Sequence, residues 1–395
     1  MSDLQEVLIV GAVRTAIGDF GGALKDVAPS ELGAKVIAEA IRRSGLTPDA
    51  VQHVVMGQVI QSEPKDAYIA RVAAVNAGVP ISAPALTLNR LCGSGVQAII
   101  SAAQMIKLGE ASVAVGGGAE SMSQSAYATK SMRWGQKMGN VVMLDALLET
   151  LNDPFGGFHM GVTAENVAKK YDISRDAQDA LAVQGHQRAA AAIADGRFKD
   201  QILPIELKTR KGTTVFDTDE HVRADTTLES LAKLRPAFDK EGSVTAGNAS
   251  GINDGAAAVV LATREVADAQ GLKPLARILS WGHAGVEPEI MGIGPIKAVP
   301  IALERAGLTL DQIDVIEANE AFAAQACAVA QELGFDPDKL NPNGSGIALG
   351  HPVGATGAIL TVKAVYELQR TGGRYGLITM CIGGGQGIAM IVERL

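Results

Sequence analysis

The chain has 395 residues, of which 47% are hydrophobic and 20% are charged, so it can bury a large core and its length allows two or three domains. A formal net charge of −8 at pH 7 argues against general binding to nucleic acid. Its three cysteines are too few and too scattered for a disulfide framework or a zinc site built on cysteine pairs, and we expect no bound metal.

The N-terminal residues lead directly into a strand-like run at 7–10, with no basic region or long apolar core, so we expect no signal peptide. No stretch reaches transmembrane length without charge or glycine. These features predict a cytoplasmic protein that does not associate with membranes.

Strand-like apolar runs then alternate with helix-length segments. In chain order the sequence predicts a strand at 7–10, a helix at 30–44, a strand at 53–58, a helix at 98–108 and a strand at 112–116. Ser30 is a candidate N-cap for the first helix, and Gly45 is a candidate stop. The alternation predicts α/β layering around a largely buried sheet.

The same scheme begins again at about residue 273. It predicts strands at 276–280, 314–317 and 375–381, and helices at 296–306, 320–333 and 358–368. The first series contains Ser94-Gly95, followed by a helix, a glycine turn and a strand. The second series contains Thr356-Gly357, followed by the same elements in the same order. A chance match of glycine-rich turns is the alternative. A true repeat predicts two similar halves that face each other, with turns from both at one shared cleft.

The middle of the chain breaks this pattern and carries most of the charged clusters. We predict an N-terminal half at 1–121, completed by about 249–272, an inserted loop domain at 122–248, and a C-terminal half at 273–395. An insertion of this size usually serves binding or assembly. The basic turn formed by Lys208, Arg210 and Lys211 offers charge for phosphates, but a solvated turn is the favoured interpretation.

Cys92 lies within Asn89-Arg-Leu-Cys92-Gly-Ser-Gly95, directly before a predicted helix. Unpaired N–H groups and the helix dipole favour an anion at that position, so we expect a lowered thiol pKa and a better nucleophile. The alternative is a small buried residue without a catalytic role.

Two further reactive side chains lie in glycine-rich turns of the C-terminal half. His351 stands between Gly350 and Pro352, and a histidine base is the usual partner of an activated thiol. Cys381 ends a strand before three glycines, whose N–H groups can bind an oxyanion. The remaining cysteine, Cys327, is predicted to pack within an apolar helix. A structural role is predicted for four other histidines, namely His53, His186, His221 and His283.

Asn319 follows a predicted strand and precedes a predicted helix. It is either a helix N-cap or, in the same cleft, a residue that orients a water toward a developing enolate.

At this point the chain resembles the thiolases over essentially its whole length. The motifs that carry the resemblance are the Cys92 segment, His159-Met-Gly-Val-Thr-Ala-Glu-Asn166, Thr245-Ala-Gly-Asn-Ala-Ser250-Gly251, Asn319-Glu-Ala-Phe322, Gly350-His351-Pro-Val-Gly354 and Cys381-Ile-Gly-Gly-Gly385. The resemblance implies the α/β thiolase fold, with two duplicated αβαβα-layered halves and an inserted loop domain. It also implies an acyltransferase that condenses two acyl-CoA molecules reversibly and cleaves short-chain 3-ketoacyl-CoA.

By this resemblance Cys92 is the nucleophile that holds the acyl group, and His351 is its base. Cys381 exchanges the proton of the attacking carbon, while His351 and a water on Asn319 stabilise the enolate. The backbone N–H groups of Cys92 and Gly383 form the second oxyanion hole.

The resemblance also implies residues that bind coenzyme A, which is expected as a substrate with no tightly bound cofactor. They are His159, Met160, Arg223, Phe238, Ala246, Ser250 and Phe322. The segment near 127–140 resembles the part that joins dimers, so a homotetramer built as a dimer of dimers is expected.

Two departures from the commoner thiolase pattern bear on substrate range. Asn343-Gly-Ser345-Gly precedes the histidine motif, and Gln386 stands where many members have Met. Both resemble bacterial β-ketothiolases that accept slightly longer acyl chains, and they weaken the case for strict acetoacetyl-CoA specificity.

Other functions fit less well. A ketoacyl synthase is expected to carry a histidine in place of Cys381 and to have no large insertion, and this chain has neither feature. A lipid-binding relative without catalysis is expected to have lost Cys92, His351 or Cys381, and all three are present. A dinucleotide oxidoreductase would need a complete G-x-G-x-x-G turn between a strand and a helix, and a serine hydrolase would need a G-x-S-x-G elbow. The sequence contains neither motif.

Overall fold

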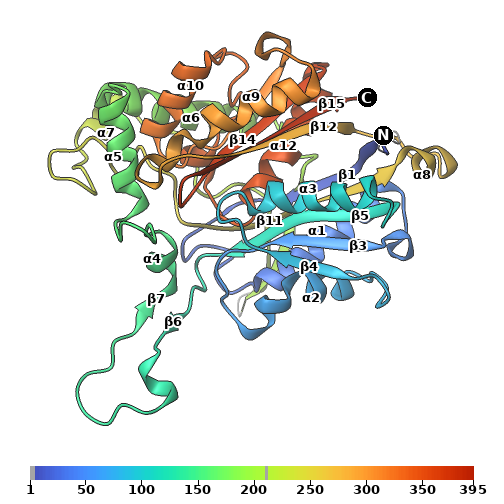
Figure 1. The fold of residues 1–395 in the computed structure, drawn as a ribbon, viewed down its shortest axis with the longest axis horizontal. Helices are drawn as coiled ribbons and strands as arrows, with labels where there is room; N and C mark the ends of the chain where they lie inside the picture. Colours follow the sequence, from blue (N-terminus) through green and yellow to red (C-terminus); the bar gives the residue numbers. More distant parts are fainter. Residues whose placement is uncertain (1–4, 210–211) are drawn as a thin grey trace.

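The structure is a computed structural model that describes residues 5–209 and 212–395. Of the basic turn considered above, Arg210 and Lys211 lie outside the described residues. Figure 1 shows two groups of strands with helices between and around them, and a long arm that extends away from the body.

The main sheet has 11 strands, nine of them in the order β13-β14-β15-β12-β1-β11-β5-β3-β4. The N-terminal part of this order contains β1 (Val7–Thr15), β3 (His53–Gly57), β4 (Ala85–Leu88), β5 (Val113–Ser121) and β11 (Asn253–Thr263). The C-terminal part contains β12 (Ala276–Gly285), β13 (Val315–Ala318), β14 (Tyr375–Ile382) and β15 (Gln386–Arg394). The short strands β2 (Gly18–Asp19) and β8 (Ile202–Leu203) pair with β11 and β1.

The strand directions reveal the repeat that the sequence predicts. In the first half, β3 is parallel to β5, which is followed by antiparallel β11 and β1. In the second half, β13 is parallel to β14, which is followed by antiparallel β15 and β12. The halves meet where β1 pairs with β12 through Leu8 with Arg277 and Ile9 with Ala276.

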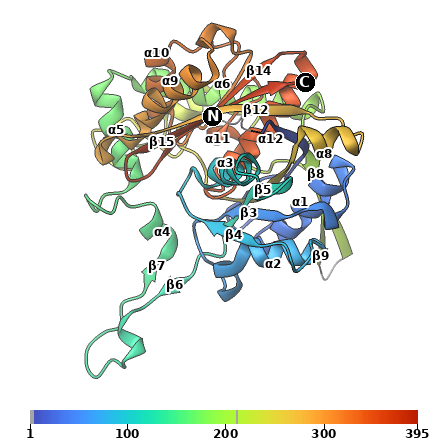
Figure 2. The same ribbon diagram turned by 45° about the vertical axis from the view of Figure 1, so that its right-hand side comes forward.

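Helices form three layers around these strands, as Figures 1 and 2 show. On the outer face of the first half lie α1 (Pro29–Ser44) and α2 (Ile69–Asn76), and on that of the second half lies α9 (Gly294–Ala306). Between the halves, α3 (Ser94–Lys107) and α12 (Thr356–Thr371) pack against each other and against strands. The predicted α/β layering is therefore confirmed.

The two central helices touch where each begins. A Cβ atom on Gly95 would lie 2.5 Å from the backbone nitrogen of Ala358, and one on Gly357 would lie 2.4 Å from that of Val96. Neither distance is possible for a real side chain, so only glycine allows this approach. The matched pairs Ser94-Gly95 and Thr356-Gly357 thus fix how the two halves meet.

The ends of α1 show one correct and one wrong prediction. Gly45 ends the helix in the left-handed conformation with φ of 81°, as predicted. Ser30 is not the N-cap: Ala28 occupies that position, and Ser30 lies inside the helix with its hydroxyl bonded to Glu63. Pro29 at the first turn explains the earlier start, since proline needs no N–H partner there.

The segment between β5 and β11 contains the arm and a group of helices. Its helices are α4 (Ala146–Thr150), α5 (Met160–Lys170), α6 (Arg175–Ala194) and α7 (Leu228–Ala232); its strands besides β8 are β6 (Tyr127–Ala128), β7 (Leu144–Asp145), β9 (Ile205–Thr209) and β10 (Gly212–Phe216). The remaining helices are α8 (Arg264–Ala269), α10 (Ala323–Leu333) and α11 (Gly346–Leu349). In Figures 1 and 2 the arm around β6 and β7 protrudes from the body in both views. None of the described helices is long and apolar enough to cross a membrane.

Candidate active site

A cavity of about 530 Å³ opens where the two halves meet the helices of the insertion. Cys92, His351 and Gly383 line it, together with all seven residues predicted to bind CoA. Asn319 and Cys381 are not among its lining residues. Asn319 lies beside Nε2 of His351, and Cys381 lies close enough to Cys92 for the two thiols to interact electrostatically.

Cys92 is presented by a tight turn between β4 and α3. The hydroxyl of Ser94 donates to the carbonyl of Leu91 at 2.7 Å and accepts from the N–H of Arg90 at 2.8 Å. Leu91 has a φ of 45°, which is uncommon for a residue with a side chain. Such strain is held by surrounding structure and is concentrated at functional sites, so this turn is built to present Cys92.

The predicted lowering of the Cys92 pKa is wrong. Burial raises the pKa of this thiol to about 11, and the nearby Glu120 carboxyl raises it further. Hydrogen bonds from the backbone N–H groups of Gly383 and of Cys92 itself act in the opposite direction. The effect of burial on the pKa exceeds that of these two hydrogen bonds, so the thiol needs a base to become a nucleophile.

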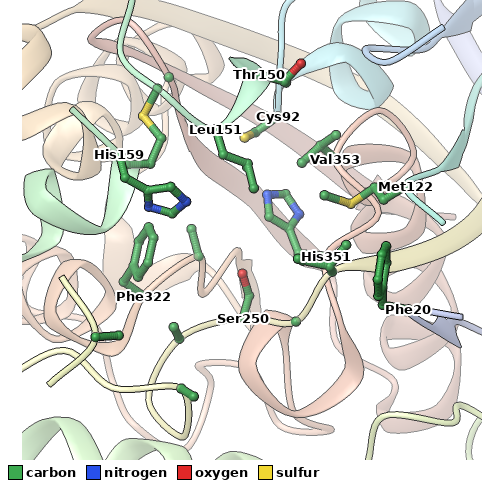
Figure 3. A pocket seen from close by; sticks show the side chains of 18 of the residues that line it. Phe20, Cys92, Met122, Thr150, Leu151, His159, Ser250, Phe322, His351 and Val353 are labelled. Carbon is green, nitrogen blue, oxygen red and sulfur yellow. The ribbon is translucent and has the colours of Figure 1, made fainter. Parts of the chain in front are cut away.

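His351 is suited to be that base. Burial lowers its pKa to about 4, which keeps the ring neutral. Its Nδ1 lies 2.7 Å from Oγ1 of Thr356, and this hydroxyl gives its only proton to the carbonyl of Pro352 at 2.9 Å. Oγ1 must therefore accept from Nδ1–H, and Nε2 carries the lone pair. Figure 3 shows the ring and the Cys92 sulfur on facing sides of the cavity.

Asn319, the residue directly after β13, supports the same ring. Its Nδ2 lies 3.4 Å from Nε2 of His351, and its side chain is buried. The alternative role as a helix N-cap is excluded, because Phe322 occupies the N-cap position of α10.

Cys381 and Gly383 come from the end of β14. Burial is the main cause that raises the pKa of the Cys381 thiol, and the neighbouring Cys92 raises it further. A Cβ on Gly383 would lie 3.0 Å from Cε of Met160 and 3.2 Å from Cδ1 of Leu91, so glycine allows the turn to approach Cys92. Cys327, by contrast, lies on α10 with its sulfur 3.8 Å from the carbonyl of Ala177, which agrees with a packing role.

Aromatic rings form one wall of the cavity. His159 is the N-cap of α5, where its Nδ1 accepts from the N–H of Gly161 at 3.0 Å. Its ring stacks on Phe238 with centroids 4.7 Å apart, and Phe238 meets Phe322 edge to face. These contacts leave a rigid apolar surface beside Met160.

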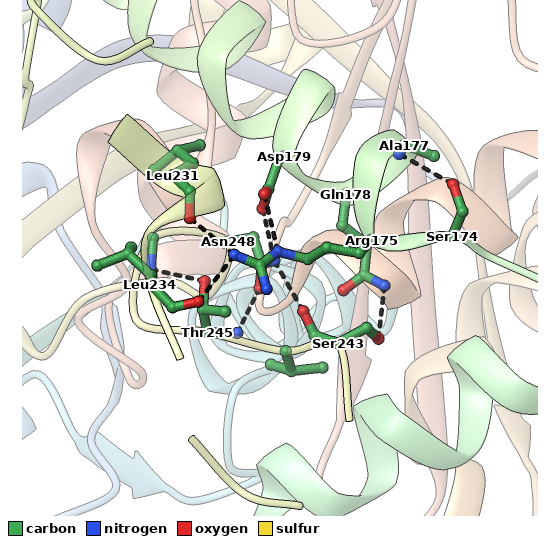
Figure 4. A network of polar contacts seen from close by, with 12 residues as sticks. Ser174, Arg175, Ala177, Gln178, Asp179, Leu231, Leu234, Ser243, Thr245 and Asn248 are labelled. Atoms are coloured by element: carbon green, nitrogen blue, oxygen red, sulfur yellow. Dashed lines mark hydrogen bonds and ion pairs between the residues drawn. The ribbon is translucent and has the colours of Figure 1, made fainter. Parts of the chain in front are cut away.

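Ala246 and Ser250 belong to a segment that lies beside Phe322, where the N–H of Ser250 donates to the carbonyl of Ala321 at 2.9 Å. Figure 4 shows how Asn248 joins this segment to α6: its Nδ2 donates to Asp179 at 2.8 Å, and its Oδ1 accepts from the N–H of Thr245 at 2.7 Å. Glu165 of α5 accepts from the N–H groups of Ser243 and Val244. Glu165 of the 159–166 motif thus holds the two residues directly before the 245–251 motif.

Comparisons with known proteins agree with this geometry. A model of the thiolase N-terminal domain matches residues 7–265, and one of the thiolase C-terminal domain matches residues 272–394. The chain belongs to the thiolase family. The fold, the acyltransferase class and the reversible Claisen condensation predicted from the sequence are those of this family.

Relatives of this thiolase span its whole length. Beta-ketothiolase BktB of Cupriavidus necator is 64% identical over 392 residues, which cover 99% of this chain and 100% of the relative. The crystal structure of the Bacillus anthracis acetyl-CoA acetyltransferase has a TM-score of 0.97 at 49% identity and covers 99% of both chains. Human mitochondrial 3-ketoacyl-CoA thiolase in complex with CoA has a TM-score of 0.96 at 45% identity and covers 99% of this chain and 98% of that one.

Sequence reasoning missed three residues of the thiolase site. Thr356 sets the tautomer of His351, as described above. His221, predicted to be structural, lies in the cavity wall. Glu120 is fully buried and accepts hydrogen bonds from the N–H groups of Val59, Ile60 and Gly354.

Glu120 connects the halves. Val59 and Ile60 follow β3 in the first half, whereas Gly354 belongs to the His351 turn of the second. Burial raises the pKa of the Glu120 carboxyl to about 8, although the three hydrogen bonds lower it. No local pattern in the sequence marks Glu120, because its partners are distant in the chain.

Proposed function

We propose that this thiolase works through an acyl group held on Cys92, with CoA thioesters as substrates and no tightly bound cofactor. The observation that carries the proposal is the meeting of Cys92, His351 and Gly383 from opposite halves in one cavity. The expected roles of the site residues are consistent with these positions.

In the first half-reaction, the neutral Nε2 of His351 takes the proton of Cys92, and the thiolate attacks the carbonyl carbon of the first acyl-CoA. The N–H groups of Cys92 and Gly383, both directed at the Cys92 sulfur, stabilise the oxyanion. The C–S bond to CoA breaks, and the leaving thiolate takes the proton of Cys381. This leaves acyl-Cys92, protonated His351 and a Cys381 thiolate.

In the second half-reaction, the Cys381 thiolate removes a proton from the methyl carbon of acetyl-CoA. A thiol whose pKa is raised by burial is a strong base once it is ionised, which suits a weak carbon acid. Protonated His351 and a water on Asn319 stabilise the enolate oxygen. The carbanion attacks acyl-Cys92, and the departing Cys92 recovers its proton from His351, so all three groups return to their initial states.

The CoA chain is proposed to lie along the cavity wall, with Arg223 toward the nucleotide. Its proposed contacts on that wall are His159, Met160, Phe238, Phe322, Ala246 and Ser250. The stacked rings and the apolar lining suit a pantetheine arm. Around the sulfur of Cys92, the apolar side chains of Met122 and Val353 leave a hydrophobic space for a short acyl chain.

We also propose a cytoplasmic homotetramer, built as a dimer of dimers through the arm. Trp134 and Met138 are 88% and 89% exposed on the arm, which is unusual for large apolar side chains. Contact between two such arms would cover them.

The test of the reaction is direct. Acetoacetyl-CoA and CoA are expected to yield acetyl-CoA, and mass spectrometry is expected to find an acetyl group on Cys92. Absence of thiolysis, or an acetyl label that persists in Cys92→Ala, would overturn the proposal.

A further inference from the structure

Two residues from distant parts of the chain form a polar pair in the cavity wall. Asp19 ends β2, and His221 follows β10; Nδ1 of His221 lies 2.5 Å from Oδ1 of Asp19. Both line the large cavity. His221 also lines an adjoining cavity of about 380 Å³, so the pair stands where the two spaces join.

The pair leaves one atom of the ring available. A carboxylate only accepts hydrogen bonds, so Nδ1 carries the proton that Asp19 binds. In the described residues Nε2 has no hydrogen-bond partner. A Cβ on Gly251 would lie 2.6 Å from Cε1 and 2.9 Å from Nε2 of His221, so only glycine leaves this edge of the ring uncovered. Gly251 lines the same cavity, directly after Ser250.

The ring is held on the framework that also positions the proposed base. Nδ2 of Asn253 lies 3.4 Å from Oδ1 of Asp19, and its Oδ1 accepts the backbone N–H of His351 at 2.9 Å. The N–H of Asp19 is bonded to Glu220 at 2.9 Å. His221 is therefore a fixed feature of the wall.

We propose that His221, held by Asp19, binds the pantetheine arm of CoA, and that its Nε2 accepts a hydrogen bond from an N–H or O–H group of that arm. The inference rests on the proposed function for the identity of the ligand. The pantetheine arm has amide and hydroxyl donors, whereas the diphosphate has only acceptors. It must also pass Ser250 and Gly251 to bring its sulfur to Cys92.

The experiment measures dissociation constants by calorimetry, without turnover. The ligands are CoA, pantetheine and adenosine 3′,5′-bisphosphate, and the proteins are the wild type, His221→Phe and Asp19→Asn. His221→Phe keeps a planar ring without the acceptor, so CoA and pantetheine are expected to bind about tenfold more weakly, with no change for the nucleotide fragment. His53→Gln is the control, since His53 starts β3 and lines neither cavity.

Asp19→Asn tests the positioning part. The new amide can donate to Nδ1, which turns Nε2 into a donor and removes the acceptor, so a similar loss is expected while thermal unfolding stays close to that of the wild type. In thiolysis both variants are expected to raise KM and keep kcat, because the ring touches no reacting atom. Unchanged CoA binding by His221→Phe, or a loss confined to the nucleotide fragment, would overturn the inference. An inactive wild type would instead overturn the proposed function and leave the binding result intact.

Discussion

Oγ1 of Thr356 accepts the Nδ1 proton of His351 at 2.7 Å and gives its own proton to the carbonyl of Pro352. This one hydroxyl determines that Nδ1 of His351 carries the proton and that Nε2 keeps the lone pair. Replacing Thr356 by Val removes the acceptor at nearly constant volume, so kcat for thiolysis is expected to fall roughly 10- to 100-fold. Thr356→Ser is the matched control and should stay near wild-type activity. If Thr356→Val changes the CoA dissociation constant and leaves kcat unchanged, the positioning role is wrong.

Cys381→Ala separates the two half-reactions. Because Cys92 and His351 remain, the variant should still acquire an acyl group on Cys92, whereas condensation should fall by about 100-fold or more for lack of the carbon base. Mass spectrometry of the acylated protein and a condensation assay measure the two effects. Simultaneous loss of both steps would argue against a separate proton-transfer role for Cys381.

Protonation of His351 should destabilise the fold in acid. The folded pKa of about 4 lies below the ordinary value of 6.5, so the unfolded chain binds more protons between these values. Stability from this group is present above pH 6.5 and is lost as the pH falls toward 4, by up to about 3 kcal/mol. Urea unfolding of His351→Asn should show a smaller decrease than the wild type over that range. Parallel pH profiles for the two proteins would contradict the prediction.

A buried ion pair joins α12 to β13. Nζ of Lys363 lies 2.6 Å from Oε2 of Glu317 and 2.6 Å from the carbonyl of Gly344, and both charged side chains are almost fully buried. Lys363→Met leaves an unpaired carboxyl, and we expect a loss of about 3–5 kcal/mol in the free energy of unfolding. Adding Glu317→Leu should restore most of it. Chemical denaturation measures the free energy of unfolding of the single and the double variant. An equal loss of stability in the two variants would contradict the claim that the unpaired carboxyl causes the loss.

The exposed arm gives a prediction about assembly. Trp134→Ser combined with Met138→Ser should convert a tetramer to dimers, because it removes the apolar surface that arm contact would cover. Light scattering coupled to gel filtration gives the mass. Leu108→Ser is a matched control, since Leu108 is 71% exposed at the end of α3, away from the arm. A tetramer that survives in the arm variant would exclude the arm as the joining element.

Local patterns in the sequence were sufficient for the layered fold. Alternating apolar runs identify strands such as β3, and Gly45 marks the end of α1, because these features depend on neighbouring residues. The position of the α1 start depends on Pro29, which the sequence analysis passed over in favour of Ser30. The boundaries of the inserted loop domain stay a prediction.

Only the site residues that lie in the recognised motifs were predicted from the sequence. The pKa of Cys92 depends on how deeply the whole fold buries the thiol, which no local pattern shows. Glu120, His221 and Thr356 were missed for a related reason. The partners of Glu120 and His221 are distant in the chain, and the role of Thr356 requires knowing where a hydroxyl proton points.

The close approach of Gly95 and Gly357 has a consequence for the order in which the protein becomes active. During synthesis Cys92 leaves the ribosome long before His351 and Cys381 exist. Until α12 docks against α3 there is no base beside the thiol and no second thiol to handle protons. The nascent chain therefore lacks the base and the second thiol that the proposed reaction needs, and docking at these two glycines brings both to Cys92.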